Sequence, residues 1–245
     1  MGRKNFLKRL FYLLFATVIL SASMVYANGI KIEMTGTPAE GWEHLWRELM
    51  IDITVIGVVF AAVTIYLLIT NRRKRPGDEG QGPKLSPLAA FGWVVIPIFV
   101  FMADDIYLAA ESFELWGNYR NVPANALVIN VEGYMWGWDV KYPEKIIITN
   151  ELRVPAGRPI HIKLTSRDVV HSFFIPDFHV KWDAVKGREN YLWFYPKQVE
   201  AGEHVMTCTE FCGMLHSSMF GKVIVMPENE FNKWIEDNKP KGGNV

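Results

Sequence analysis

Two long apolar segments constrain the fold of this chain more than any other feature of its sequence. Residues 50–69 form a run of twenty residues whose one charged side chain, Asp52, lies near its first end. Residues 88–110 form a second run of twenty-three residues, which contains Asp104 and Asp105. A helix needs about 20 mostly apolar residues to cross the hydrocarbon core of a bilayer. We therefore expect two membrane-spanning helices.

The segment between the two spans, residues 71–87, is short and basic. Its cationic side chains stand among glycines and prolines, and they are Arg72, Arg73, Lys74, Arg75 and Lys84. Short loops rich in Lys and Arg stay on the cytoplasmic side of a membrane. The sequence thus predicts a two-helix transmembrane hairpin, with everything after the second span exported to the outer face.

The first 27 residues have the features of a secretory signal peptide. Four basic residues precede an apolar run over residues 10–22, and small residues flank a cleavage point after Ala27. An uncleaved signal anchor is the alternative, because the apolar run is only slightly short for a span. We expect residues 28–115 to form the hairpin and residues 116–240 to form the exported domain, on the outer face of a bacterial-type plasma membrane.

The exported part has the pattern of an all-β domain. From residue 126 onward, eight short runs rich in β-branched and aromatic residues alternate with turn signals. This pattern predicts a Greek-key sandwich or barrel of roughly 110 residues. After Pro227, two acidic residues precede Phe231 and Trp234, which predicts a short closing helix.

The charge balance excludes one class of partner. The chain has 26 Lys and Arg against 26 Asp and Glu, a formal net charge of zero. A nucleic-acid phosphate backbone requires a basic surplus. We expect no nucleic-acid partner.

A cluster of potential metal ligands carries the main functional signal. The two cysteines of the chain, Cys208 and Cys212, are followed closely by His216 and Met219. Soft sulfur donors with imidazole favour copper. A mononuclear blue-copper centre uses one thiolate, whereas two thiolates can bridge a pair of copper ions, and a second imidazole is then needed. His171, in a loop after another strand, is the best candidate. A disulfide between the cysteines is the alternative, although it leaves the rest of the spacing unexplained.

The segment from Cys208 to Met219, which reads CxExCGxxHxxM, resembles the CuA motif of cytochrome c oxidase subunit II. The resemblance extends over the whole chain. It includes the two-span hairpin, the aromatic pair Trp136 and Trp138, and the run HSFFIPxFxVKxDAVxGR that begins at His171. It implies a cupredoxin-like fold for the exported domain, with a CuA centre.

The resemblance also implies residue roles. The implied ligands of two copper ions are His171, Cys208, Glu210, Cys212, His216 and Met219. The two cysteines bridge the ions, and Glu210 binds through its backbone carbonyl while its carboxylate reaches a magnesium ion at the junction with subunit I. Trp136 matches the residue through which electrons enter. Alternation along a strand would place Trp136 and Trp138 on one face, where simple packing is the other interpretation.

The implied function belongs to a complex. The chain would accept electrons from an exported c-type cytochrome and pass them to heme in subunit I, where oxygen is reduced. Its partners would be subunit I, the other oxidase subunits and the lipid bilayer, and no catalytic residue is expected in this chain. Asp168 and Asp183 match positions near the face on which the donor docks, and a solvated surface role is the alternative for both.

Some alternatives stay open. Many family members carry a Glu at the start of the second span, where this chain has Pro87 and Leu88. Because of this difference, and because of Asp104 and Asp105, a second hypothesis stays open, in which the chain is the CuA subunit of a nitric oxide reductase. The two aspartates mark either a helix end near the headgroups or functional intramembrane carboxylates. A membrane-tethered copper-delivery protein is the alternative from a different class. The histidines that we expect not to bind metal are His44, His161, His179 and His204, of which the last shares strand parity with a cysteine.

Overall fold

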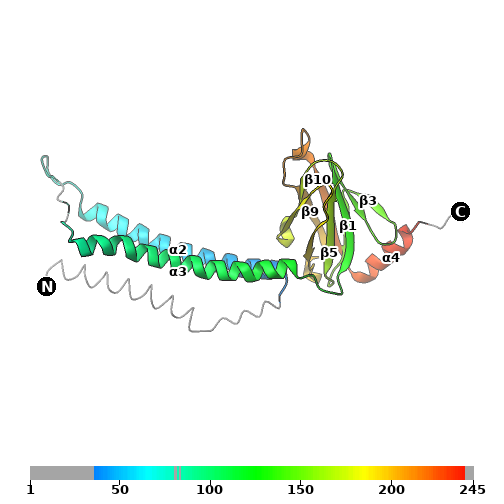
Figure 1. The fold of residues 1–245 in the computed structure, drawn as a ribbon, viewed down its shortest axis with the longest axis horizontal. Helices are drawn as coiled ribbons and strands as arrows, with labels where there is room; N and C mark the ends of the chain where they lie inside the picture. Colours follow the sequence, from blue (N-terminus) through cyan, green and yellow to red (C-terminus); the bar gives the residue numbers. More distant parts are fainter. Residues whose placement is uncertain (1–35, 80–81, 83, 241–245) are drawn as a thin grey trace. The chain divides into compact units, whose positions relative to one another are not determined.

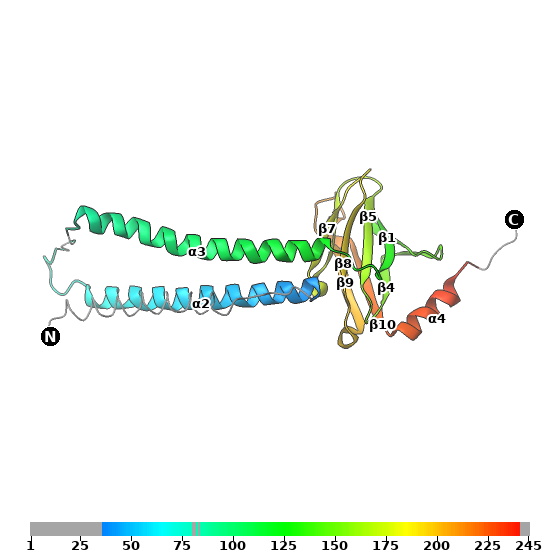
Figure 2. The same ribbon diagram turned by 60° about the horizontal axis from the view of Figure 1, so that its bottom comes forward.

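The computed structural model describes residues 36–79, 82 and 84–240. The expected signal peptide, residues 1–27, lies outside this range. Within it, two long helices are followed by ten β-strands and a C-terminal helix, as Figure 1 and Figure 2 show from two directions.

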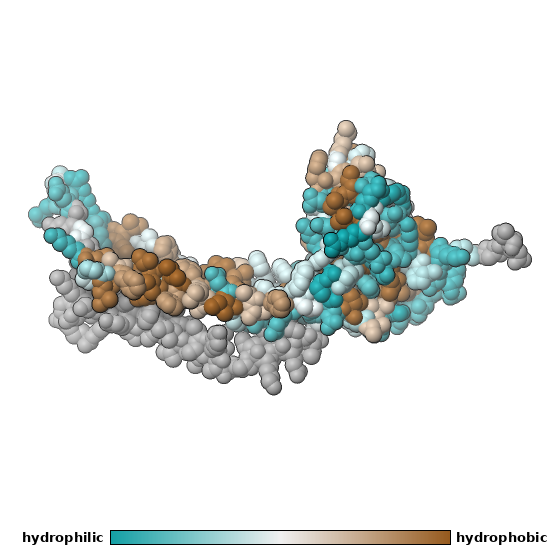
Figure 3. Space-filling model, viewed as in Figure 1, coloured by the Kyte–Doolittle hydropathy of each residue, from teal (hydrophilic) through white to brown (hydrophobic). Residues whose placement is uncertain are grey.

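The two long helices contain the expected spans and exceed both of them. Helix α2 runs over Pro38–Thr70 and helix α3 over Pro87–Arg120. Each begins at a capping hydroxyl, Thr37 or Ser86, followed by a proline whose missing N–H costs nothing in the first turn. Their most apolar windows have mean hydropathies of 2.5 and 1.8, and the protein buries none of those residues. Figure 3 shows the resulting apolar surface along both helices, which suits a lipid environment.

Two carboxylates lie within α3 rather than at its end. The helix continues past Asp104 and Asp105 as far as Arg120. Asp104 is half-buried, whereas Asp105 is exposed. The helix therefore does not end at these aspartates, and their position relative to the headgroups stays a prediction.

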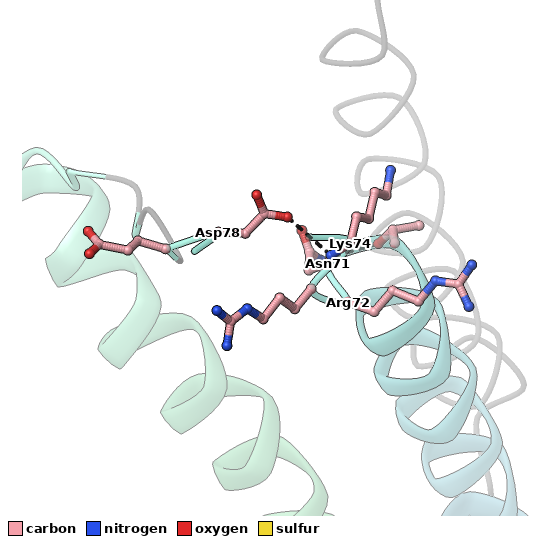
Figure 4. A pocket seen from close by; sticks show the side chains of 7 residues that line it. Asn71, Arg72, Lys74 and Asp78 are labelled. Atoms are coloured by element: carbon pink, nitrogen blue, oxygen red, sulfur yellow. Dashed lines mark hydrogen bonds between the residues drawn. The ribbon is translucent and has the colours of Figure 1, made fainter. Parts of the chain in front are cut away.

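The connection between the helices is held by one carboxylate. The side chain of Asp78 accepts hydrogen bonds from the backbone N–H groups of Lys74 and Arg75, at 3.1 and 2.8 Å (Figure 4). Within the described residues, Arg72 and its basic neighbours have no carboxylate within salt-bridge distance. The loop therefore keeps the positive charge from which its cytoplasmic location is inferred.

The exported domain is a sandwich of two five-stranded sheets, with strand orders β3-β2-β1-β5-β8 and β4-β10-β9-β6-β7. The strands are β1 (Leu127–Tyr134), β2 (Gly137–Lys141), β3 (Ile147–Thr149), β4 (Glu151–Pro155), β5 (Ile160–Ser166), β6 (His171–Ile175), β7 (Val180–Ala184), β8 (Asn190–Phe194), β9 (Gly202–Cys208) and β10 (Phe220–Met226). Pairs β1–β5 and β4–β10 are parallel and the remaining pairs are antiparallel. The strands of each parallel pair are not consecutive along the chain, so the chain must cross between the sheets to connect them. This arrangement confirms the expected cupredoxin-like sandwich.

The core lies between the two sheets. Strand β5 shows the alternation that builds it, because Ile160, Ile162 and Leu164 are fully buried while the residues between them face outward. Trp138 and Phe173 contribute large buried rings close to His171. Helix α4 (Glu228–Asn238), drawn in red in Figure 1, is the expected closing helix.

Candidate metal centre

The expected copper ligands come from one end of the second sheet. Cys208 is the last residue of β9, and the connection to β10 projects at that end of the sandwich (Figure 1). Strand β6 pairs with β9 so that Phe173 lies opposite Cys208. His171 is therefore brought beside the cysteine by the strand register, and it is the first residue of β6 rather than part of a loop.

The two thiols are free and close together. The Sγ atoms of Cys208 and Cys212 are 3.8 Å apart and both residues are buried. A disulfide requires an S–S distance of about 2.05 Å, so the disulfide alternative does not fit. The Nδ1 atom of His171 lies 3.9 Å from the Cys208 sulfur, and that of His216 lies 3.5 Å from the Cys212 sulfur.

Two weaker donors complete the cluster. The thioether of Met219, fully buried, has its Sδ atom 3.7 Å from the Cys212 sulfur. The backbone carbonyl of Glu210 accepts a hydrogen bond from the Cys208 thiol at 3.2 Å, while the residue itself is exposed. Each of the four other expected donors thus lies within 3.9 Å of one of the two cysteine sulfurs, and the donors of His171, Cys208 and Cys212 lie within 4.8 Å of one another. Two thiols, two imidazoles and a thioether form a donor set that fits copper.

The surroundings of Cys212 affect the protonation of its thiol. Burial, followed by the hydrogen bond with Cys208 and the charge of Cys208, raises the pKa of the Cys212 thiol to about 12. In the metal-free chain this thiol is therefore protonated at neutral pH. A copper ion must displace the proton when it binds.

Asp168 fixes the orientation of one imidazole. Its carboxylate lies 2.8 Å from Nε2 of His171, which leaves Nδ1 facing the thiols. Burial alone would raise the pKa of Asp168, but the hydrogen bonds from His171, Met135 and Val169 more than offset it and hold the pKa below its usual value. An ionised carboxylate behind an imidazole sets its tautomer and its basicity. From the sequence, Asp168 was expected to serve donor docking or to be a solvated surface carboxylate, although its spacing of three residues from His171 could have indicated this contact.

Trp136 lies in the two-residue turn between β1 and β2. Its indole Nε1–H donates to the carbonyl oxygen of Cys212 at 3.2 Å, and the ring packs on Gly213. Trp138, in contrast, is fully buried on β2, with its ring edge-on to those of Phe173 and His171. The two tryptophans therefore do not share a strand face, because the turn separates them.

The other expected residues lie outside the cluster. Asp183 is exposed on β7. The four histidines expected not to bind metal have other neighbours: His44 lies near Glu48, His161 beside Tyr191, His179 on Trp42, and His204 against Asp177. Within the described residues, none of them joins the group of donors around Cys208.

Comparison with known proteins identifies the family. The family model for "Cytochrome C oxidase subunit II, periplasmic domain" matches residues 116–226. Cytochrome c oxidase subunit 2 of Thermostichus vulcanus is 34% identical, over 77% of this chain and 73% of that protein. Heme-copper oxidase subunit 2 of Aeropyrum pernix is 30% identical, over 77% of this chain and 88% of that protein. The chain belongs to the cytochrome c oxidase subunit II family.

One solved structure is also similar, the periplasmic domain of subunit II of cytochrome oxidase from Bradyrhizobium japonicum. It is 32% identical with a TM-score of 0.46, and the match covers 49% of this chain and 97% of that one. As a cytochrome c oxidase subunit II, this chain is a subunit of an oxidoreductase complex and a membrane protein with an outer-facing domain. The resemblance inferred from the CxExCGxxHxxM segment is confirmed, and the cluster of His and Cys donors is compatible with copper.

Proposed function

We propose that this chain is the electron-entry subunit of a respiratory cytochrome c oxidase. It would accept electrons from an exported c-type cytochrome and relay them to heme in subunit I, where oxygen is reduced. Two copper ions bound at the centre would supply rapid one-electron exchange. The observation that carries the proposal is the convergence of two free, buried thiols with two imidazoles and a thioether at one end of the sandwich.

The protein residues would have distinct roles in holding the metal. Cys208 and Cys212 would bridge the ions, because their sulfurs face each other. His171 and His216 lie next to different cysteines, so each would cap one ion. The remaining ligands would be the Met219 thioether and the Glu210 carbonyl. His171 and Cys208 are held at strand ends, and both of them as well as Cys212 are buried, so the site would change shape little during electron transfer.

The outer side of the centre would receive the electron. Trp136 is half-exposed and its indole is hydrogen-bonded to the backbone of Cys212, so it connects the surface with a ligand. We therefore propose Trp136 as the entry residue. Of the two candidates for donor docking, Asp183 is exposed, whereas the carboxylate of Asp168 is hydrogen-bonded to the His171 ring and to the backbone N–H of Met135.

Two further assignments concern the partner subunits. The Glu210 residue is exposed, so its carboxylate is free to bind a magnesium ion at the junction with subunit I.

Asp104 and Asp105 are proposed as functional carboxylates of the membrane part, because ionisable side chains at such positions usually face partners or water paths. Heme would be held by subunit I only.

The test is purification of the complex from membranes by a tag on this chain. We expect a heme-containing subunit I to co-purify and the preparation to consume oxygen when given reduced c-type cytochrome. Cys208→Ser should abolish this activity, whereas Ser217→Ala, an exposed residue of the same loop, should not. Consumption of nitric oxide but not oxygen would instead identify a nitric oxide reductase. Ready loss of copper to a chelator, without turnover, would identify a copper-delivery protein.

A further inference from the structure

We propose that Arg167 is a positioning residue that holds the β1–β2 hairpin, and with it Trp136, against the copper-binding loop. The proposal rests on the proposed role of Trp136 in electron entry. Arg167 itself is not among the six expected ligands, and its side chain is half-exposed.

The location of Arg167 connects the two segments that surround the centre. It directly follows β5 and begins the short segment that leads to His171. Its backbone N–H donates to the carbonyl of Gly133 on β1 at 2.9 Å. The next residue, Asp168, accepts a hydrogen bond from the backbone of Met135, next to Trp136. The segment that carries one copper ligand is thus joined to the hairpin that carries the entry residue.

The hairpin contains an unfavourable pair of carboxylates, and Arg167 contacts both of them. Glu132 and Asp139 lie directly opposite each other in the register of β1 and β2. Like charges at such positions repel and destabilise the pairing of the strands. The Nη2 atom of Arg167 lies 2.8 Å from the Glu132 carboxylate and 2.6 Å from that of Asp139. Its guanidinium also covers the ring of Tyr134, 4.8 Å from the centroid, close to the turn.

The geometry of Trp136 is sensitive to this pairing. Its hydrogen bond to the Cys212 carbonyl is 3.2 Å long, at the upper end of the usual range for such a bond. A small opening of the hairpin would break it. An ion pair at the surface contributes little to global stability, so the effect of Arg167 is local and concerns the position of the hairpin tip.

The experiment compares four variants in the purified oxidase complex. Arg167→Gln tests the proposal, and Trp136→Phe is the reference for loss of the entry residue. Lys163→Gln is the matched control, because Lys163 lies on β5, which Arg167 follows, and its salt bridge is formed with Glu189, at 3.0 Å, rather than with a hairpin carboxylate. The double variant R167Q/D139N removes the repulsion together with the arginine. Its remaining carboxylate, Glu132, still has Lys141 at 2.8 Å.

For each variant we would measure the turnover rate at saturating reduced cytochrome and the KM for the cytochrome. Copper content, the electron paramagnetic resonance spectrum and hydrogen exchange of residues 131–140 complete the measurements. We expect R167Q to lower the saturating rate about fivefold and to speed exchange in the hairpin, with the copper spectrum unchanged. Lys163→Gln should behave as wild type. R167Q/D139N should recover most of the rate, because the effect of each change depends on the other.

Several results would overturn the proposal. If Trp136→Phe is slow but R167Q keeps its saturating rate, or changes the KM alone, Arg167 does not position the entry residue and the proposed function stands. If Trp136→Phe is not slow, the entry role of Trp136 fails and the proposal fails with it. If R167Q does not assemble, assembly of R167Q/D139N would support the repulsion argument, and its failure to assemble would contradict that argument.

Discussion

At the scale of single residues, Asp168 offers a direct test of how the centre is built. Its carboxylate is hydrogen-bonded to Nε2 of His171, so it orients the ring whose Nδ1 atom faces the thiols. Loss of such a partner usually weakens metal binding about 10- to 100-fold. We expect Asp168→Ala to bind copper more weakly by a factor in this range, measured by competition with a chelator of known affinity. Asp183→Ala removes an exposed carboxylate and should leave copper affinity unchanged; equal losses in the two variants would contradict the assigned contact.

Gly133 is a second residue whose identity the site requires. A Cβ atom at this position would lie 2.9 Å from Cζ3 of Trp138 and 3.1 Å from Cδ2 of His171. Both rings are fully buried, so they cannot move away freely. We expect Gly133→Ala to lower the free energy of unfolding by about 1–3 kcal/mol and to alter the copper spectrum. Gly117→Ala in α3, where a Cβ meets no atom within 4 Å, is the control, and thermal unfolding of the copper-loaded chain is the measurement. An unchanged spectrum in Gly133→Ala would show that the two rings adapt.

Most of the expected ligands could be selected from the sequence because they lie close together in a single motif. Cys208, Cys212, His216 and Met219 fall within twelve consecutive residues, and soft donors at that spacing indicate copper without knowledge of the fold. The contact of Trp136 with the copper-binding loop could not be predicted in this way. It depends on a two-residue turn whose position is fixed by the register of β1 and β2, and alternation alone suggested a strand.

At the scale of structural elements, the contact of β9 with the short helical turn before β7 predicts a pH dependence. Burial alone would lower the pKa of His204, but hydrogen bonds to the Glu200 carbonyl and the Asp177 carboxylate raise it above its usual value. A histidine with a raised pKa in the folded state stabilises the fold fully below its unfolded pKa of about 6.5. This stabilisation is lost as the pH rises through the folded pKa.

We therefore expect the wild-type chain to lose stability relative to His204→Gln as the pH is raised from about 6 to 8. Thermal unfolding of both copper-loaded chains across this range is the measurement. Parallel curves for the two chains would contradict the assigned hydrogen bonds. Asp177→Asn should reduce the same difference, because it removes the charged acceptor.

Sequence patterns located most elements but not all of them. The eight expected runs correspond to strands, whereas β4 and β7 had no separate expectation. Both are five residues long, and outward-facing charged side chains such as Arg153 and Lys181 interrupt their apolar pattern. The lengths of the two long helices were underestimated for a related reason. The expected spans, residues 50–69 and 88–110, included only the apolar stretches that match the thickness of a bilayer. Helix α3 continues beyond its span with polar residues, as far as Arg120.

At the scale of the whole molecule, the basic loop and the β-sandwich are expected to lie on opposite sides of a membrane. The loop carries Arg72–Arg75 without salt bridges to the described carboxylates, and the family places the copper domain on the periplasmic side. With the buried thiols protected by copper, we expect Glu79→Cys to react with a membrane-impermeant maleimide only in opened cells. Lys239→Cys, at the end of the sandwich domain, should react in intact cells. Labelling of both positions from the same side would contradict the hairpin topology.

The most direct test of the central claim is the copper content of the purified chain together with its electron paramagnetic resonance spectrum. The converging thiols, imidazoles and thioether predict two copper ions per chain, with hyperfine structure from one unpaired electron shared by both nuclei. Cys212→Ser, which lacks one bridging thiolate, should lose this signature. One copper per chain with a mononuclear spectrum in the wild-type protein would contradict the account.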